Sequence, residues 1–176
     1  MLNMNFEQRV VIETDQQPWI ASPHVGVWRK PLARESAERG HATSLVKFNA
    51  GASFSEHDHP LGEEILVLSG TFSDYSGDYQ AGSYFRNPEG FKHAPFSKEG
   101  CVLFVKLHQF THGDDEHVVV DTQKTDWSPG MGGLSVMPLH SYQGESTALV
   151  KWPKGERFQL YSHFGGEEVF VIRGEF

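Results

Sequence analysis

The chain repeats part of its own sequence, and this repeat restricts its possible folds more than any other feature. When residues 51–72 are placed over residues 155–176, nine of the 22 positions are identical without a gap, at an offset of 104 residues. The likeness extends upstream, where TSLVKF at 43–48 lies over TALVKW at 147–152. A fixed internal period of this kind indicates that one structural unit has been duplicated.

The repeat predicts one complete unit and part of another. We expect a first unit over residues 1–120 and the first half of a second unit over residues 121–176, joined through the polar, acidic segment THGDDEH at 111–117. A half unit leaves strand edges without partners, and such edges favour pairing with another chain. The sequence therefore predicts a homo-oligomer, a dimer or larger.

Composition and patterning indicate an all-β protein. Glycine (18), proline (9) and phenylalanine (13) are frequent, as in short strands that are joined by turns and carry aromatic side chains inwards. Runs rich in β-branched and aromatic residues predict strands at 44–48, 64–72, 82–86 and 101–110, with a turn at 73–79. No long amphipathic helix is expected.

Charge and cysteine content exclude several classes of function. The formal net charge is −8, from 15 Lys and Arg against 23 Asp and Glu, and there is no Lys/Arg cluster. Nucleic acid and anionic membranes are therefore not expected as partners. Cys101 is the single cysteine, which fits a reducing compartment. The first residues lack a signal-peptide pattern, and no run of about 18 apolar residues exists, so we expect a cytoplasmic protein.

Three histidines and one glutamate stand at spacings typical of a metal site. His57 and His59 are two residues apart, so on a strand both imidazoles point to one side. Glu63 follows beyond Pro60, and His93 comes after another strand and a turn. Three imidazoles and a carboxylate suit Zn, Fe, Mn, Ni or Co as the divalent ion, and the ligand types alone do not choose among them. We expect one such ion, with one or two positions left for water or a small molecule.

The glycines around these residues make the pattern specific. Gly51, five residues, His57-x-His59, three residues, Glu63, six residues and Gly70 resemble the first signature of the cupin superfamily. Gly82, five residues, Pro88-x-Gly90, two residues and His93 resemble the second signature. The resemblance implies a jelly-roll barrel, also called a double-stranded β-helix, present here as a tandem repeat of two cupin units. Ser97 stands where this family usually has a structural asparagine.

Neighbouring residues leave some alternatives open. Glu64 is the other candidate for the carboxylate ligand, but both the cupin spacing and strand parity with the histidines favour Glu63. Cys101 opens a strand and is expected to be a small buried hydrophobe, with a redox-sensing thiol or a soft metal ligand as alternatives. In the second unit Tyr161 replaces the first histidine while His163 and Glu167 remain. We therefore expect the second unit to be degenerate and free of metal.

One longer stretch resembles a particular group of cupins. Residues 57–110, with the phrases GEEILVLSGTFSD, GDYQAGSYFRNP and HAPFSKEGC, resemble the cupin domain of ChrR-type anti-sigma factors. The resemblance implies a metal-binding sensory or regulatory protein with a sigma-factor-like protein partner. Standalone relatives of this group include oxygen-dependent enzymes that cleave diketones and hydroxyketones, so an enzyme acting on a small molecule is the alternative. A third possibility is a storage or structural protein whose metal only stabilises the fold.

Overall fold

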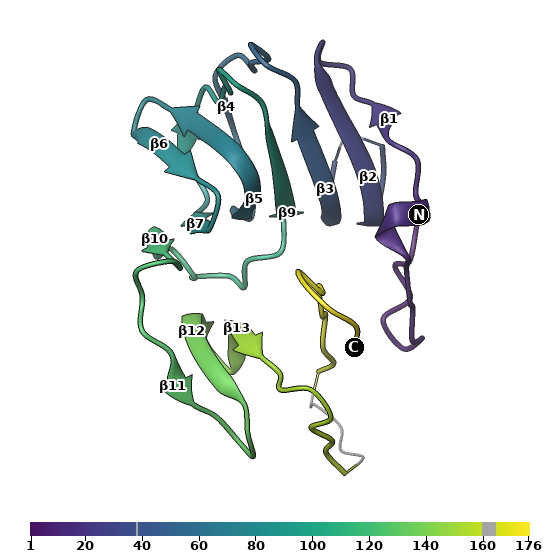
Figure 1. The fold of residues 1–176 in the computed structure, drawn as a ribbon. Coiled ribbons are helices and arrows are strands. Elements are labelled where there is room, and N and C mark those ends of the chain that lie inside the picture. Colours follow the sequence, from purple (N-terminus) through teal and green to yellow (C-terminus); the bar gives the residue numbers. More distant parts are fainter. Residues whose placement is uncertain (38, 160–164) are drawn as a thin grey trace.

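The structure of the protein is a computed structural model that describes residues 1–37, 39–159 and 165–176. Apart from one short 3-10 turn, the elements of these residues are all strands, which confirms the all-β prediction (Figure 1). The elements are η1 (Thr14–Gln16), β1 (Ile20–Ala21), β2 (Val27–Arg34), β3 (Ala42–Phe48), β4 (His57–Asp58), β5 (Glu63–Asp74), β6 (Gly77–Gln80), β7 (Ser83–Asn87), β8 (Lys92–His93), β9 (Cys101–Leu107), β10 (Val118–Asp121), β11 (Ser128–Pro129), β12 (Ser135–Tyr142) and β13 (Glu145–Lys151).

The strands form one large curled sheet and two small ones. The large sheet has the order β1-β2-β3-β9-β5-β7-β10, and β6 adds to β5. β4 pairs with β8, and β11-β12-β13 form a separate sheet. All these pairs are antiparallel. β5 bends strongly and brings β6 and β7 over the other strands, which gives the first unit its jelly-roll shape (Figure 1).

The four strands predicted for the first unit are confirmed as β3, β5, β7 and β9. Two bounds differ. β5 continues to Asp74, so the predicted turn shrinks to the two residues between β5 and β6. β9 stops at Leu107 rather than continuing to residue 110, because His108 has a φ of 57°, which turns the backbone out of the extended conformation.

Alternate side chains of these strands fill the barrel. The core of the first unit consists of buried apolar residues whose neighbours in sequence face outwards, as expected for strands with one face inside. Its members are Val27, Phe48, Ala52, Ile65, Val67, Phe72, Phe85, Cys101, Leu103 and Val105. The interior of the barrel is therefore a packed core.

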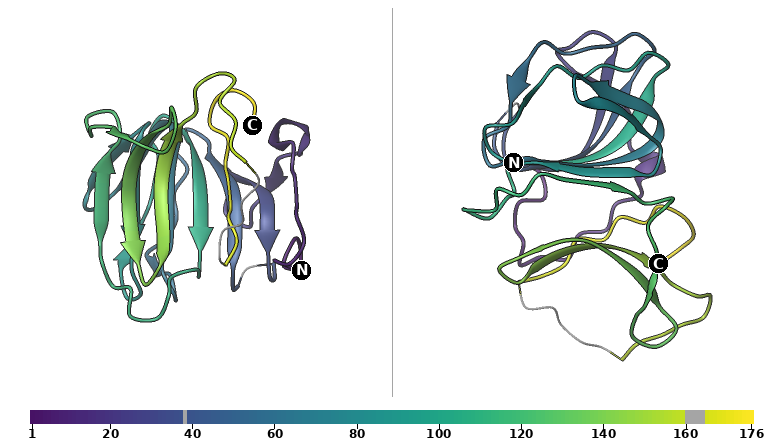
Figure 2. Two further views of the ribbon diagram at one scale, coloured as in Figure 1. Left: turned by 90° about the horizontal axis from the view of Figure 1, so that it is seen from below. Right: turned by 90° about the vertical axis from the view of Figure 1, so that its left-hand side faces the viewer.

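The second unit lies as a separate layer against the outside of the barrel (Figure 2). The layers meet in a second apolar cluster, in which Leu66 and Tyr84 of the barrel pack with Met137 and Leu139 of β12. β10 directly follows the connecting segment and pairs with β7 of the barrel, so it joins the two parts. The outer face of β5, β7 and β9 is thus covered by the second unit.

The pairing of β2 with β3 resembles that of β12 with β13. In the first unit Pro31 lies opposite Ser44, and the register of β2 with β3 shifts directly after this proline. In the second unit Pro138 lies opposite Ala148, and the register of β12 with β13 shifts at the same point. Proline has no backbone N–H to donate to a neighbouring strand, which makes a bulge a natural place for it.

Side chains that form the core of the first unit have exposed counterparts in the second unit. Val67 is 1% exposed while its counterpart Val171 is 43% exposed, and Phe72 is 1% exposed while Phe176 is 78% exposed. Phe48 and Ile65 are likewise buried, whereas Trp152 and Val169 at the matching positions are exposed. Residues 165–176 belong to no strand, although they align with β5.

Among the residues that the structure describes, no helix has the length and apolar character needed to cross a lipid bilayer.

Candidate metal centre

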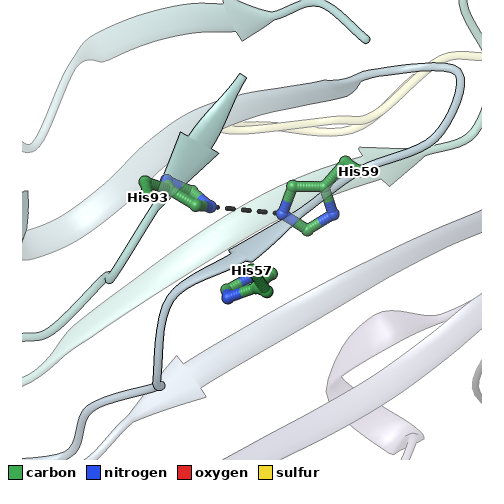
Figure 3. A group of neighbouring side chains, drawn as sticks. All are labelled: His57, His59 and His93. Carbon is green, nitrogen blue, oxygen red and sulfur yellow. Dashed lines mark hydrogen bonds between the residues drawn. The ribbon is translucent and has the colours of Figure 1, made fainter. Parts of the chain in front are cut away.

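The three histidines are placed by a two-stranded ladder. β4 and β8 pair antiparallel, with His57 directly opposite His93. His59 follows His57 by two residues and turns to the same cluster, and the three imidazoles point towards one another (Figure 3). The structure thus brings together the three histidines that the sequence singled out.

A tight bend carries the chain from β4 to Glu63 at the start of β5. Leu61 and Gly62 both have positive φ, of 56° and 76°. A Cβ atom on Gly62 would lie 2.5 Å from the ring of Phe110, so only glycine fits at this point. The bend aims Glu63 at the cluster, four residues after His59.

The atoms at the centre of the cluster lie at the spacing of ligands around one ion. Nε2 of His59 is 3.2 Å from Nε2 of His93. Oε1 of Glu63 is 3.3 Å from Nε2 of His59, and Oε2 is 3.4 Å from Nε2 of His93. One ring nitrogen of His57 lies within 4.8 Å of those of the other two histidines. Ligands about 2.1 Å from one ion are separated by roughly 3.0–3.5 Å, so the donor atoms of His59, Glu63 and His93 are spaced as ligands of a single ion.

Neighbouring groups fix which nitrogen of His57 and of His93 faces the centre. Nδ1 of His57 lies 2.9 Å from the carbonyl oxygen of Ser55, and Nδ1 of His93 lies 3.4 Å from Oδ2 of Asp74. Both contacts place the N–H of the ring at Nδ1 and turn the Nε2 lone pair inwards, as in most metal-binding histidines. Asn87 donates from Nδ2 to Oε2 of Glu63 at 3.1 Å and so orients the carboxylate.

Asp74 and Asn87 are site residues that the sequence did not indicate. Asp74 was taken as part of a turn, and Asn87 lies just after the strand predicted at 82–86. The pairing of β5 with β7 places Asn87 opposite Glu63, and the bend of β5 brings Asp74 to His93. Neither relationship leaves a local signal, because each depends on contacts between strands.

Burial and neighbouring charges shift the pKa values of the buried site residues in opposite directions. Burial lowers the pKa of His59, and the nearby Glu63 offsets this only in part. Burial would also lower the pKa of His93, but the hydrogen bond with Asp74 and the charges of Glu63 and Asp74 raise it overall. Burial would raise the pKa of Asp74, but the contacts with His93 and the backbone of Ser76 lower it. Asp74 is therefore a carboxylate held beside an imidazole.

The alternative ligand Glu64 lies on the other face of β5. Its side chain is buried against the second unit, where Oε1 accepts a hydrogen bond of 2.6 Å from the hydroxyl of Tyr84. Burial and the Glu64 carboxylate raise the pKa of Tyr84 strongly, so the phenol keeps its proton. Glu64 thus pairs with a neutral donor, away from the histidines.

Two further residues that the sequence singled out, Ser97 and Cys101, make contacts that stabilise the fold and do not bind at the cluster. Ser97 is fully buried, and its hydroxyl donates to the carbonyl oxygen of Thr71 at 2.6 Å. Cys101 belongs to the apolar core, and burial raises the pKa of its thiol. A thiol with a raised pKa stays protonated and is a poor nucleophile, which favours the interpretation of Cys101 as a small buried hydrophobe.

The predicted loss of the metal site in the second unit falls mostly outside the described residues. Tyr161 and His163 are not among them. Glu167 is described and is exposed. Within the described ranges, the one cluster of three or more potential ligands that satisfies the geometry of a metal site is that of His57, His59 and His93.

Comparisons with known proteins identify the family and the fold. A family model described as the ChrR cupin-like domain matches residues 7–111 and 115–176. A protein from Nostoc punctiforme, provisionally described as a dioxygenase, has a similar structure, with a TM-score of 0.59 and 15% identity over 70% of this chain and 50% of that one. An RmlC-like cupin protein from Ralstonia eutropha gives a TM-score of 0.51 and 20% identity over 68% of this chain and 85% of that one.

A third similar structure is the complex of the sigma factor SigE with the anti-sigma factor ChrR from Rhodobacter sphaeroides. Its TM-score is 0.45, with 21% identity over 53% of this chain. The chain spans 49% of the length of that relative. No curated protein matches the sequence.

Proposed function

Because the chain belongs to the family of ChrR cupin-like domains, we propose that it is a regulatory metalloprotein whose first unit holds one divalent transition-metal ion. The proposed ligands are His57, His59, Glu63 and His93. The observation that carries the proposal is the convergence of Nε2 of two histidines and both oxygens of Glu63 within 3.2–3.4 Å. A cluster of two buried imidazoles and a buried carboxylate is costly without a charge to hold it together.

The donor set supports a borderline ion rather than a hard one. Three imidazoles and one carboxylate suit Zn, Fe, Mn or Ni, whereas Mg and Ca prefer oxygen ligands throughout. When bound, such an ion acts as a Lewis acid for an oxygen atom placed at its open positions. His57 is the most exposed of the three histidines, so the open positions would face the side from which small molecules arrive.

The regulatory role is proposed at the level of the family. A ChrR-like regulator acts on another protein, so the proposed partner is a sigma-factor-like protein. The barrel would transmit the state of its metal through β5, because this strand begins at Glu63 and also packs through Leu66 against the second unit. Loss or exchange of the ion would alter the contact that fixes the position of Glu63, at the first residue of β5.

A second candidate function is a metal-dependent dioxygenase that acts on diketone- or hydroxyketone-like substrates. What favours it is a hollow of about 210 Å³ beside the proposed ligand His57, which Glu56, Asp58 and Lys92 also line. An enzyme needs room for its substrate beside the ion, whereas a regulator that senses only its metal needs no such space.

Elemental analysis of protein purified without added metal tests the shared part of both candidates. About one ion per chain supports the proposal, and a metal-free protein with intact His57 contradicts it. Zinc at this site would favour the regulator, since zinc has no redox chemistry. Iron or manganese together with oxygen uptake in the presence of acetylacetone would favour the enzyme, and capture of a sigma factor by the metal-loaded protein would favour the regulator.

Three further proposals accompany this function. The division into a complete unit at 1–120 and a partial unit at 121–176 is supported by the matching bulges after Pro31 and Pro138. A cytoplasmic location is supported by the single buried cysteine. Homo-oligomer formation is supported by the exposed apolar side chains of the second unit.

A further inference from the structure

The proposed metal ligands differ in how far water reaches them. His59, Glu63 and His93 are 9%, 6% and 0% exposed, whereas His57 is only half-buried. The ring centroid of His57 lies 4.7 Å from that of His59 and 4.9 Å from that of His93, so its imidazole stands between the buried ligands and the surface (Figure 3). An ion that arrives from water therefore meets His57 before the other three ligands.

His57 also lines an open hollow. The hollow measures about 210 Å³, and its other lining residues are Glu56, Asp58 and Lys92. Because a single water needs roughly 10–15 Å³ of accessible space, the hollow has room for a divalent ion that still carries its shell of waters. The exposed side of the metal centre thus opens into a space large enough for a hydrated ion.

Two carboxylates at this hollow are available to a cation. Glu56 and Asp58 flank His57 in the sequence, and both are exposed. In the ranges that the structure describes, neither carboxylate forms an ion pair. Lys92 lies opposite Asp58 in the ladder of β4 with β8 and brings one ammonium group to the same space. Two carboxylates and one ammonium leave the hollow with one net negative charge.

Charges at this position act on the rate at which an ion arrives. A unit charge about 7 Å from a divalent ion in water changes the local concentration of that ion about fivefold at low ionic strength. Charges around the entrance of a site change mainly the association rate and its dependence on salt, whereas the dissociation rate follows the direct contacts of the bound species.

We propose that this hollow is the entry port through which the metal ion reaches its buried ligands, with Glu56 and Asp58 attracting the hydrated cation and Lys92 weakening that attraction. His57 binds the ion first and passes it inwards to His59, Glu63 and His93. The proposal rests on the proposed function and adds to it the route and rate of metal loading. In a regulator that responds to its metal, the three charged side chains of the port set how quickly the protein responds.

Stopped-flow mixing of the metal-free full chain with Co²⁺ measures this route. The visible absorption of cobalt bound to imidazole and carboxylate reports association, and a chase with EDTA gives the dissociation rate. For the double variant Glu56→Gln/Asp58→Asn we expect association to slow about fivefold or more at low ionic strength, while the dissociation rate changes less than about twofold. Lys92→Gln should act in the opposite direction and speed association by about twofold to fivefold.

Ionic strength and a matched variant separate this effect from general damage. At about 1 M salt the Debye length is about 3 Å, so all variants should associate at rates within about twofold of the original chain. Asp121→Asn/Asp126→Asn removes the same number of charges at exposed positions of residues 121–176, and should associate as the original chain does. Circular dichroism and the metal content at saturating Co²⁺ are measured for every variant.

The outcomes distinguish the port from the metal site. One ion per chain with an unchanged association rate in Glu56→Gln/Asp58→Asn, or an equal slowing in the matched control, would overturn the entry port and leave the metal site intact. If the double variant fails to fold, Lys92→Gln decides alone, and an association rate equal to that of the original chain overturns the port. A chain that binds no Co²⁺ at equilibrium would contradict the proposed function and the port with it.

Discussion

His93 and Asp74 face each other inside the barrel, with Nδ1 of the imidazole 3.4 Å from Oδ2 of the carboxylate. Both side chains are buried, and they are 19 residues apart in the sequence. The contact selects the ring nitrogen that can face a metal ion and holds the ring at a fixed angle. The two residues thus form a carboxylate–histidine pair of the kind that commonly supports a metal ligand.

Removing the charge of Asp74 should lower the metal affinity of the site but leave its proposed ligands in place. For Asp74→Asn we expect metal affinity to fall about 10- to 100-fold, while saturating metal still gives one ion per chain. A competition titration with a chromophoric chelator measures the affinity. Asp121→Asn, at a carboxylate paired on the surface with Lys124, is the control and should bind metal as the original chain does. An unchanged affinity in Asp74→Asn would show that the pair does not support a ligand.

The proposed ligands themselves should behave differently from the histidine of the second unit. His57→Ala should abolish stoichiometric metal and with it the rise in melting temperature that metal gives, because an ion bound only to the folded state stabilises it by mass action. His57 is preferred over the fully buried His93 for this test, since its replacement disturbs the core less. His163→Ala is the comparison and should keep one ion per chain; a halved metal content there would contradict the degenerate second unit.

The clustering of the proposed ligands was predictable because their signal is local. His57 and His59 are two residues apart, and strand parity with them separates Glu63 from Glu64, whose side chain lies on the other face. The hollow beside His57 was not predictable in the same way. Its lining includes Lys92 of β8 because β8 pairs with β4, and no local pattern in the sequence records which strands pair.

The connecting segment shows a second limit of sequence reasoning. Its polar, acidic composition indicated the join between the units but not that Asp114 is buried between Arg86 of β7 and His140 of β12. The Arg86 guanidinium also lies over the ring of Phe110, 3.8 Å from its centroid. Because one residue comes from each unit and one from the join, only the packed structure reveals that this charge holds the two units together.

Asp114 should make the stability of the chain depend on pH. Burial would raise the pKa of this carboxyl, but the hydrogen bonds and charges of Arg86 and His140 lower it below its ordinary value of 3.8. A group with a lowered pKa in the folded state stabilises the fold at pH values above its unfolded pKa. That contribution is lost as the pH falls through the folded pKa.

Denaturation of Asp114→Asn by urea measures this contribution. At pH 7 we expect the variant to lose about 3 kcal/mol of unfolding free energy, because the charge of Arg86 stays buried without its partner. The difference from the original chain should narrow as the pH falls below 3.8 and the original carboxyl also becomes neutral. Asp121→Asn, at a more exposed carboxylate, should differ little at either pH. A constant difference at all pH values would contradict the assignment.

The exposed face of the second unit should drive association of this chain with itself. Val169 and Val171 are 50% and 43% exposed, although their counterparts in the barrel are buried. Trp152, Ile172 and Phe176 of this unit are exposed as well, and exposed apolar side chains that gather on one surface commonly mark a site of association. We therefore expect light scattering after size exclusion to report a dimer or larger. Replacing both valines by serine should shift the assembly to the monomer, because the apolar area available for burial falls.

Val25→Ser, at an apolar residue of the first unit that is 94% exposed, is the matched control and should keep the original assembly. If the double variant and the control elute alike at every concentration, this face does not mediate association.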